Sequence, residues 1–88
     1  MAASKNLDLG IMAEGFREMG FTVEKEQVDG MPGVEALQAS IETGRGEMRV
    51  YTVYGGIRIG KPNGSGKYYW GTEKQCLAVV RQTLKCYQ

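Results

Sequence analysis

Near its start the chain repeats apolar residues at helical spacing, at Leu9, Met12, Phe16 and Met19. This spacing predicts an amphipathic helix over about residues 6–19 that ends at Gly20. Gly10 and Gly15 lie inside this segment, and each costs roughly 1 kcal/mol relative to alanine in a helix. We therefore expect the helix to depend on packing against the rest of the domain.

The next two segments lead into the middle of the chain. Residues 21–28 are rich in β-branched side chains and are followed by turn residues at 29–33, which predicts a strand. Residues 34–43 fit two patterns, because their apolar positions match a helix face but also alternate with polar ones. The glycine turn at 44–46 would complete a hairpin with the strand that follows, which favours a strand. A helix at 34–43 stays open and would remove one strand from the sheet.

The clearest strand is predicted at residues 47–54. Arg49 and Tyr51 alternate there with apolar residues, so the two kinds of side chain occupy opposite faces. The glycines at 55 and 56 predict a tight turn into a further strand at 57–59. Arg58 alternates with isoleucines in that strand, so all three polar or aromatic residues point outward if the apolar set faces the helices.

The end of the chain predicts a second helix. A glycine-rich loop at 60–67 leads to a short strand at 68–70, and residues 72–75 then have the form of a capping box. An apolar stripe follows, made of Leu77, Val80, Leu84 and Tyr87. The sequence therefore predicts one α+β domain over residues 1–88, an antiparallel β-meander of three to four strands with N-terminal and C-terminal helices packed on one face.

Charge is distributed unevenly, although the net charge is only +1. Residues 1–47 hold nine acids and four bases, whereas residues 48–88 hold one acid and seven bases. Six of the eight aromatic residues lie in this basic half. Arginine beside tyrosine and tryptophan is typical both of protein interface hot spots and of surfaces that bind nucleic acid. The predicted partner-binding residues are Arg49, Tyr51, Arg58, Lys61, Lys67, Tyr69 and Trp70.

The composition argues against catalysis. The chain has no histidine, so the usual general base near neutral pH and the common metal sites are missing. Cys76 and Cys86 lie ten residues apart in one predicted helix, about 15 Å along its axis, which is too far for a disulfide. Both are interpreted as small, partly buried apolar residues. We expect no enzymatic activity, no cofactor and no metal.

The sequence also leads to expectations about the cellular location of the protein and about its binding partner. The chain starts without a secretory or transit pattern, and its longest apolar run, residues 77–80, is far short of the ~20 residues that span a bilayer. We therefore expect a cytoplasmic protein without membrane contact. The favoured function is docking on a protein or nucleoprotein partner, as an inhibitor or adaptor does. The alternative is nucleic-acid binding through the basic, aromatic half, and both a monomer and a homodimer stay open.

Parts of this layout resemble known families. The order of helix, strands and helix resembles double-stranded-RNA-binding domains, which carry a lysine cluster where the second helix begins. This chain offers only Lys74 there. Residues 70–72 are similar to the aromatic-Gly-Thr step that precedes the helix of phage-integrase arm domains, and that likeness covers about twenty residues. These resemblances assign no family.

Overall fold

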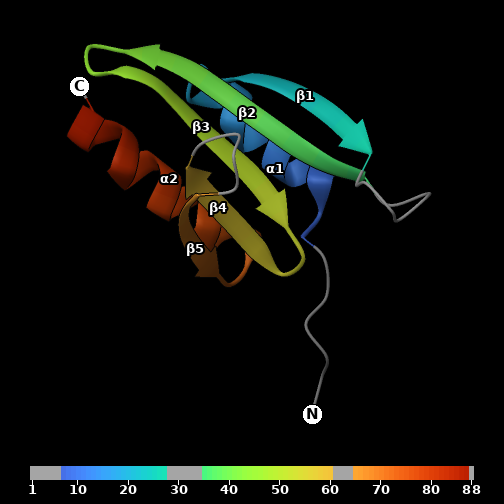
Figure 1. Ribbon diagram of the computed structural model, residues 1–88. Helices are drawn as coiled ribbons and strands as arrows, with labels where there is room; N and C mark the ends of the chain where they lie inside the picture. The colour runs from blue at the N-terminus through green and yellow to red at the C-terminus, as the bar shows by residue number, and fades with distance from the viewer. Residues whose placement is uncertain (1–6, 28–34, 61–64, 88) are drawn as a thin grey trace.

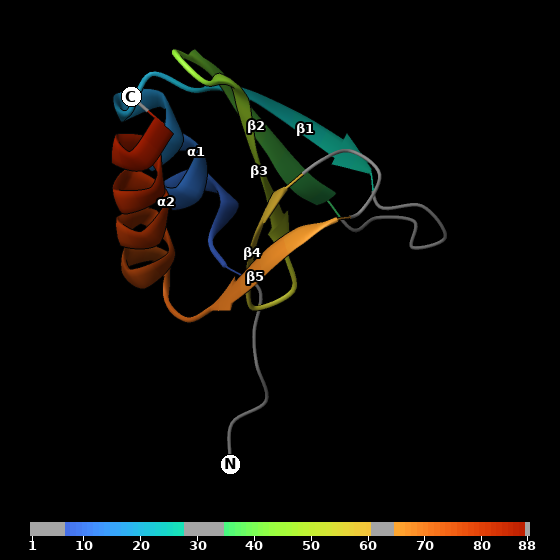
Figure 2. The same ribbon diagram turned by 60° about the vertical axis from the view of Figure 1, so that its left-hand side comes forward.

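The computed structural model describes residues 7–27, 35–60 and 65–87. Within these ranges the chain forms two helices and five strands: α1 (Leu9–Glu18), β1 (Thr22–Gln27), β2 (Glu35–Thr43), β3 (Gly46–Val53), β4 (Gly56–Gly60), β5 (Gly66–Trp70) and α2 (Glu73–Tyr87). The described strands form one antiparallel sheet in the order β1-β2-β3-β4-β5. Both helices lie on the same side of it (Figures 1 and 2).

The predicted fold class is confirmed, with five strands in the described sheet rather than three to four. Residues 35–43 form a strand, which decides between the two patterns of that segment. The turn after β3 consists of residues 54 and 55, one position earlier than predicted, because Gly56 already pairs with Val53. The predicted turn at 29–33 and residues 61–64 of the predicted loop lie outside the described residues, and the strand after that loop begins at Gly66 rather than at residue 68.

The ends of the two helices are fixed by side-chain caps. The Asp8 carboxylate accepts a hydrogen bond from the Ile11 backbone N–H, so α1 begins after Asp8 rather than at residue 6. The predicted capping box is confirmed, because the Thr72 hydroxyl accepts from the Gln75 N–H and the Gln75 side chain accepts from the Thr72 N–H. The Glu73 carboxylate accepts from the Asp8 backbone N–H at 2.7 Å, which ties the start of α2 to the start of α1.

The core lies between the helices and one face of the sheet. Its largest fully buried side chains come from both helices and from β2, β3 and β4: Phe16, Met12, Leu37, Met48, Ile57, Val50, Val80 and Cys76. The helices approach closely at Gly15, where an added Cβ would lie 2.5 Å from a Leu77 methyl carbon. Gly15 has a lower helix propensity than alanine, but this cost is offset by the close contact between α1 and α2 that only a residue without a side chain permits.

Two glycines, Gly56 at the start of β4 and Gly44 in the turn between β2 and β3, give a matched test of the packing of β4 against β5. A Cβ at Gly56 would collide with the Tyr69 carbonyl oxygen, whereas a Cβ at Gly44 would meet nothing within 4 Å. We expect Gly56→Ala to lower the free energy of unfolding by about 2 kcal/mol, in the range for overpacking. Gly44→Ala should change it by less than about 0.5 kcal/mol. Urea unfolding measures both, and equal effects would contradict the close approach of β4 and β5.

Candidate functional site

The face of the sheet opposite the helices carries most of the predicted binding residues. Gln38, Tyr51, Arg58 and Tyr68 lie side by side on successive strands from β2 to β5. Their chain neighbours point to the helix side, because successive side chains of a strand alternate between faces. In the described part of the chain neither helix covers this surface (Figure 2). We call it the open face.

Arg58 is the most buried residue of this row. It is 8% exposed, and its guanidinium carbon lies 4.2 Å from the centre of the Tyr51 ring. Its Nη1 donates a hydrogen bond of 2.6 Å to the Ser65 carbonyl oxygen. Such a cation–π contact contributes about 0.5–2 kcal/mol, more as it is desolvated. Arg58 therefore links β3 and β4 to the residue that precedes β5.

Two large aromatic rings stand exposed beside Arg58. Tyr68 and Trp70 are two residues apart on β5, so their rings share the open face, and the rings stack with centroids 5.5 Å apart at an angle of 12°. Tyr68 is 50% exposed and Trp70 is 64% exposed. Trp70 lies opposite Gly56, and its ring carbon Cε3 would be 2.8 Å from a Cβ at that glycine. The two rings therefore form a stacked pair on β5, with Trp70 lying over the strand-paired glycine of β4.

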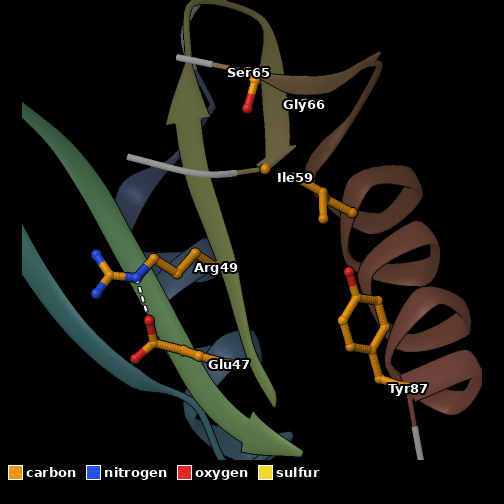
Figure 3. A pocket seen from close by; sticks show the side chains of 7 residues that line it. Glu47, Arg49, Ile59, Ser65, Gly66 and Tyr87 are labelled. Atoms are coloured by element: carbon orange, nitrogen blue, oxygen red, sulfur yellow. Dashed lines mark hydrogen bonds and ion pairs between the residues drawn. The ribbon is translucent and has the colours of Figure 1, made fainter. Parts of the chain in front are cut away.

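Arg49 has its charge paired within β3. Its guanidinium donates to the carboxylate of Glu47, two residues away on the same face (Figure 3). The hydrogen bond that Arg49 donates to Glu47, and after it the neighbouring Tyr51, raise the pKa of Arg49 above its ordinary value. Because arginine is charged at every physiological pH, this shift changes no charge. The raised pKa of Arg49 reflects the ion pair with the Glu47 carboxylate.

The open face passes from acidic to aromatic across the sheet. Glu24 lies opposite Gln38, so Glu24 and Glu26 of β1 belong to the open face at one edge. Tyr68 and Trp70 belong to it at the other edge. Because a meander places strands in chain order (Figure 1), the acidic residues of β1 and the aromatic residues of β5 lie at opposite edges of the sheet.

A pocket lies at one end of the sheet, between β3 and the end of α2. It has a volume of about 230 Å³ and is lined by Glu47 and Arg49, by the adjoining ends of β4 and β5, and by Tyr87. In Figure 3 the Tyr87 ring projects from α2 toward Ile59. The ionised side chains of its lining are the paired Glu47 and Arg49, so the described lining offers no separate acid or base for catalysis.

The structure divides the predicted site residues between the two faces. Arg49, Tyr51, Arg58 and Trp70 share the open face, whereas Lys67 and Tyr69 belong to the helix side. Lys67 is exposed there, and Tyr69 is partly buried against the core, opposite Ile57. Lys61 lies outside the described residues.

Tyr68 is the open-face residue that the sequence interpretation missed. The signal that would have found it is alternation within β5, because Trp70 and Tyr69 are neighbours and only one of them can face outward. The residue two positions before Trp70 shares its face.

Reactive chemistry is sparse in the described residues. No group of three or more metal-ligating side chains is found among them, and none of the helices they form is long and apolar enough to cross a membrane. Both cysteines are free, with Cys76 buried and Cys86 exposed rather than partly buried. Burial, and after it the nearby Glu73, raise the pKa of the Cys76 thiol above its ordinary value. Cys76 is therefore a protonated packing residue and a poor nucleophile.

The hydroxyl of Tyr51 gives one test of this site. It is buried and has no hydrogen-bond partner of acceptable geometry in the described structure, although Arg49 lies near it. Because a buried unpaired hydroxyl costs free energy, we expect Tyr51→Phe to leave the free energy of unfolding unchanged or to raise it by up to about 1 kcal/mol. Tyr51→Leu, which removes the ring under Arg58, should lower it by about 1–2 kcal/mol. If Tyr51→Phe lowered the free energy of unfolding as much as Tyr51→Leu does, the Tyr51 hydroxyl would have to form a hydrogen bond in the folded protein.

The Cys76 thiol gives a second test, through pH. Because its pKa is higher folded than unfolded, the unfolded chain releases its proton first as pH rises. The stability it contributes is present below the ordinary thiol pKa of about 8.5 and is lost as pH rises toward the folded value. The difference in unfolding free energy between wild type and Cys76→Ala should therefore shrink above that pH. Thiol titration of the native protein should modify Cys86 alone, and rapid labelling of Cys76 would contradict its burial.

Comparison of the chain with protein-family models, with curated proteins and with solved structures finds no match. The function is therefore inferred from the open face and its contacts.

Proposed function

We propose that this protein acts by binding, docking its open face on a protein or nucleoprotein partner and occluding the surface it covers, as inhibitors and adaptors do. The observation that carries this proposal is the stacked, exposed pair of Tyr68 and Trp70 on β5. Tryptophan and tyrosine are enriched among the residues that dominate binding energy at protein interfaces. Rings that are already ordered before binding lose little conformational entropy when they dock.

The partners of the arginines favour a protein surface over a bare nucleic acid. Nucleic-acid binding takes much of its affinity from lysines and arginines that neutralise phosphates. Arg58 is instead buried against Tyr51 and Ser65, and Arg49 is paired with Glu47. Glu24 and Glu26 on the same face would repel a polyanion.

The change from acidic to aromatic residues across the open face indicates the chemistry of the partner. To bind the aromatic pair on β5, the partner would need an apolar pocket that receives the Trp70 ring at its centre. The acidic side chains of β1 call for basic groups on the partner toward the other edge of the contact, since complementary charge fixes orientation and speeds association. The acidic residues of β1 would then orient the partner, and the aromatic residues of β5 would supply most of the binding energy.

A matched pair of substitutions tests the docking face. Trp70 is exposed on the open face, and Ile11 is a comparably exposed apolar residue on α1, 51% exposed. We expect Trp70→Ala to weaken the complex with a protein partner, isolated by affinity capture from the source cell, at least about 30-fold. This is the effect of losing a hot spot worth about 2 kcal/mol. Ile11→Ala should bind like wild type. Calorimetry measures both, and loss of binding in Ile11→Ala with retention in Trp70→Ala would contradict the proposal.

A nucleic-acid titration tests the alternative directly. Fluorescence anisotropy with labelled single-stranded and duplex DNA and RNA, at about 50 and 200 mM salt, reports phosphate contacts through a steep salt dependence. The proposal expects no tight binding to any of the four. Micromolar binding that weakens with salt and is lost in Trp70→Ala would overturn it in favour of nucleic-acid recognition.

A further inference from the structure

The two edges of the sheet differ in character. In the described structure neither β1 nor β5 pairs with a further strand on its outer side. Glu24, Lys25 and Glu26 follow one another on β1 and are all exposed. Consecutive charges on an edge strand are a common protection against pairing with another chain. β5 has a single charged residue, Lys67, among glycine, tyrosine and tryptophan. The β5 edge is therefore the unprotected one.

We propose that β5 pairs antiparallel with β5 of a second copy of this chain, which joins two sheets into one continuous sheet in a twofold-symmetric dimer. An edge strand presents a row of unpaired N–H and C=O groups, and pairing satisfies them. The inference concerns the backbone edge rather than the open face, so it does not depend on the function proposed above.

The sequence of β5 is self-complementary about Tyr68. An antiparallel pair centred on Tyr68 places Trp70 of each copy opposite Gly66 of the other. The same combination already occurs inside the chain, where Trp70 lies opposite Gly56 and its ring lies over the position of the missing Cβ. An aromatic ring beside a cross-strand glycine covers backbone that the glycine leaves bare.

The same register meets two further conditions. It places Lys67 opposite Tyr69 of the other copy, so the two lysines do not face each other directly, which would be unfavourable. It also pairs open-face residues with open-face residues, because positions 66, 68 and 70 share one face. A shift by one residue would break this match.

A dimer of this kind affects how the open face is displayed. The twofold axis of an antiparallel edge pair is perpendicular to the sheet, so both open faces point to the same side. The Tyr68 and Trp70 pairs of the two copies then lie next to each other. Only five residues of each chain form β5, so the interface is small and the dimer is expected to be weak and concentration-dependent.

Disulfide trapping tests both the contact and its register. Residues directly opposite in an antiparallel pair have Cα atoms about 4.5–5.5 Å apart, within the range of a disulfide. In a Cys86→Ser background, Tyr68→Cys should therefore form a covalent dimer on mild oxidation, while buried Cys76 stays reduced. Glu24→Cys, on the other edge strand, is the matched control and should stay monomeric. Cross-linking of Tyr68→Cys no faster than the control would overturn the proposal.

Sedimentation of the unmodified protein gives an independent readout. Wild type should show a reversible monomer–dimer equilibrium, and Tyr68→Lys, which places two like charges on the twofold axis, should weaken it at least about tenfold. Glu24→Lys should leave it unchanged. The proposal would be overturned if the wild-type protein stayed monomeric at the highest concentration measured. It would also be overturned if the wild type formed polymers larger than a dimer and Glu24→Lys abolished them, because such polymers would indicate that β5 pairs with β1 of another copy. The sedimentation experiment uses the purified protein without a binding partner, so either outcome tests the dimer alone and leaves the proposed docking function untouched.

Discussion

The buried charge of Arg58 is the constraint on which the open face depends. A charged group held out of water is costly unless it is paired or hydrogen-bonded. Arg58 meets this requirement with the Tyr51 ring below it and the Ser65 carbonyl oxygen beside it. To do so it must draw β3, β4 and the start of β5 together. β5, which Arg58 helps to hold beside β4, carries Tyr68 and Trp70 as a stacked pair.

The helices explain why this face stays uncovered. Short hairpins connect the described strands from β2 to β4, so the meander needs no crossover helix. The helices at the two ends of the chain pack on each other as well as on the sheet, at Gly15 against Leu77 and through the Asp8 and Glu73 hydrogen bond. One layer of helices therefore covers one face of the sheet, and among residues 7–27, 35–60 and 65–87 no helix covers the other face.

Much of the fold follows from local pattern. The capping box at 72–75 and the apolar stripes fix both helices, and alternation in residues 47–54 fixes which side of β3 faces outward. The site was harder to predict, because local pattern does not tell how deeply a residue sits. Arg58 faces outward as predicted and yet is buried, since the Tyr51 ring and the Ser65 carbonyl come from other strands or loops. Alternation within β5 places Tyr68 on the same face as Trp70 and Tyr69 on the other, and the register with β4 shows which of these faces lies opposite the helices.

The proposed function requires that partners reach this protein through the open face and not through its helices. Site-specific photo-crosslinking in the source cell tests it most directly, with a benzophenone amino acid in place of Trp70 or, in a separate variant, in place of Ile11. We predict a covalent adduct to a protein from position 70 and none from position 11. Adducts from position 11 alone, or adducts from position 70 to nucleic acid alone, would contradict it.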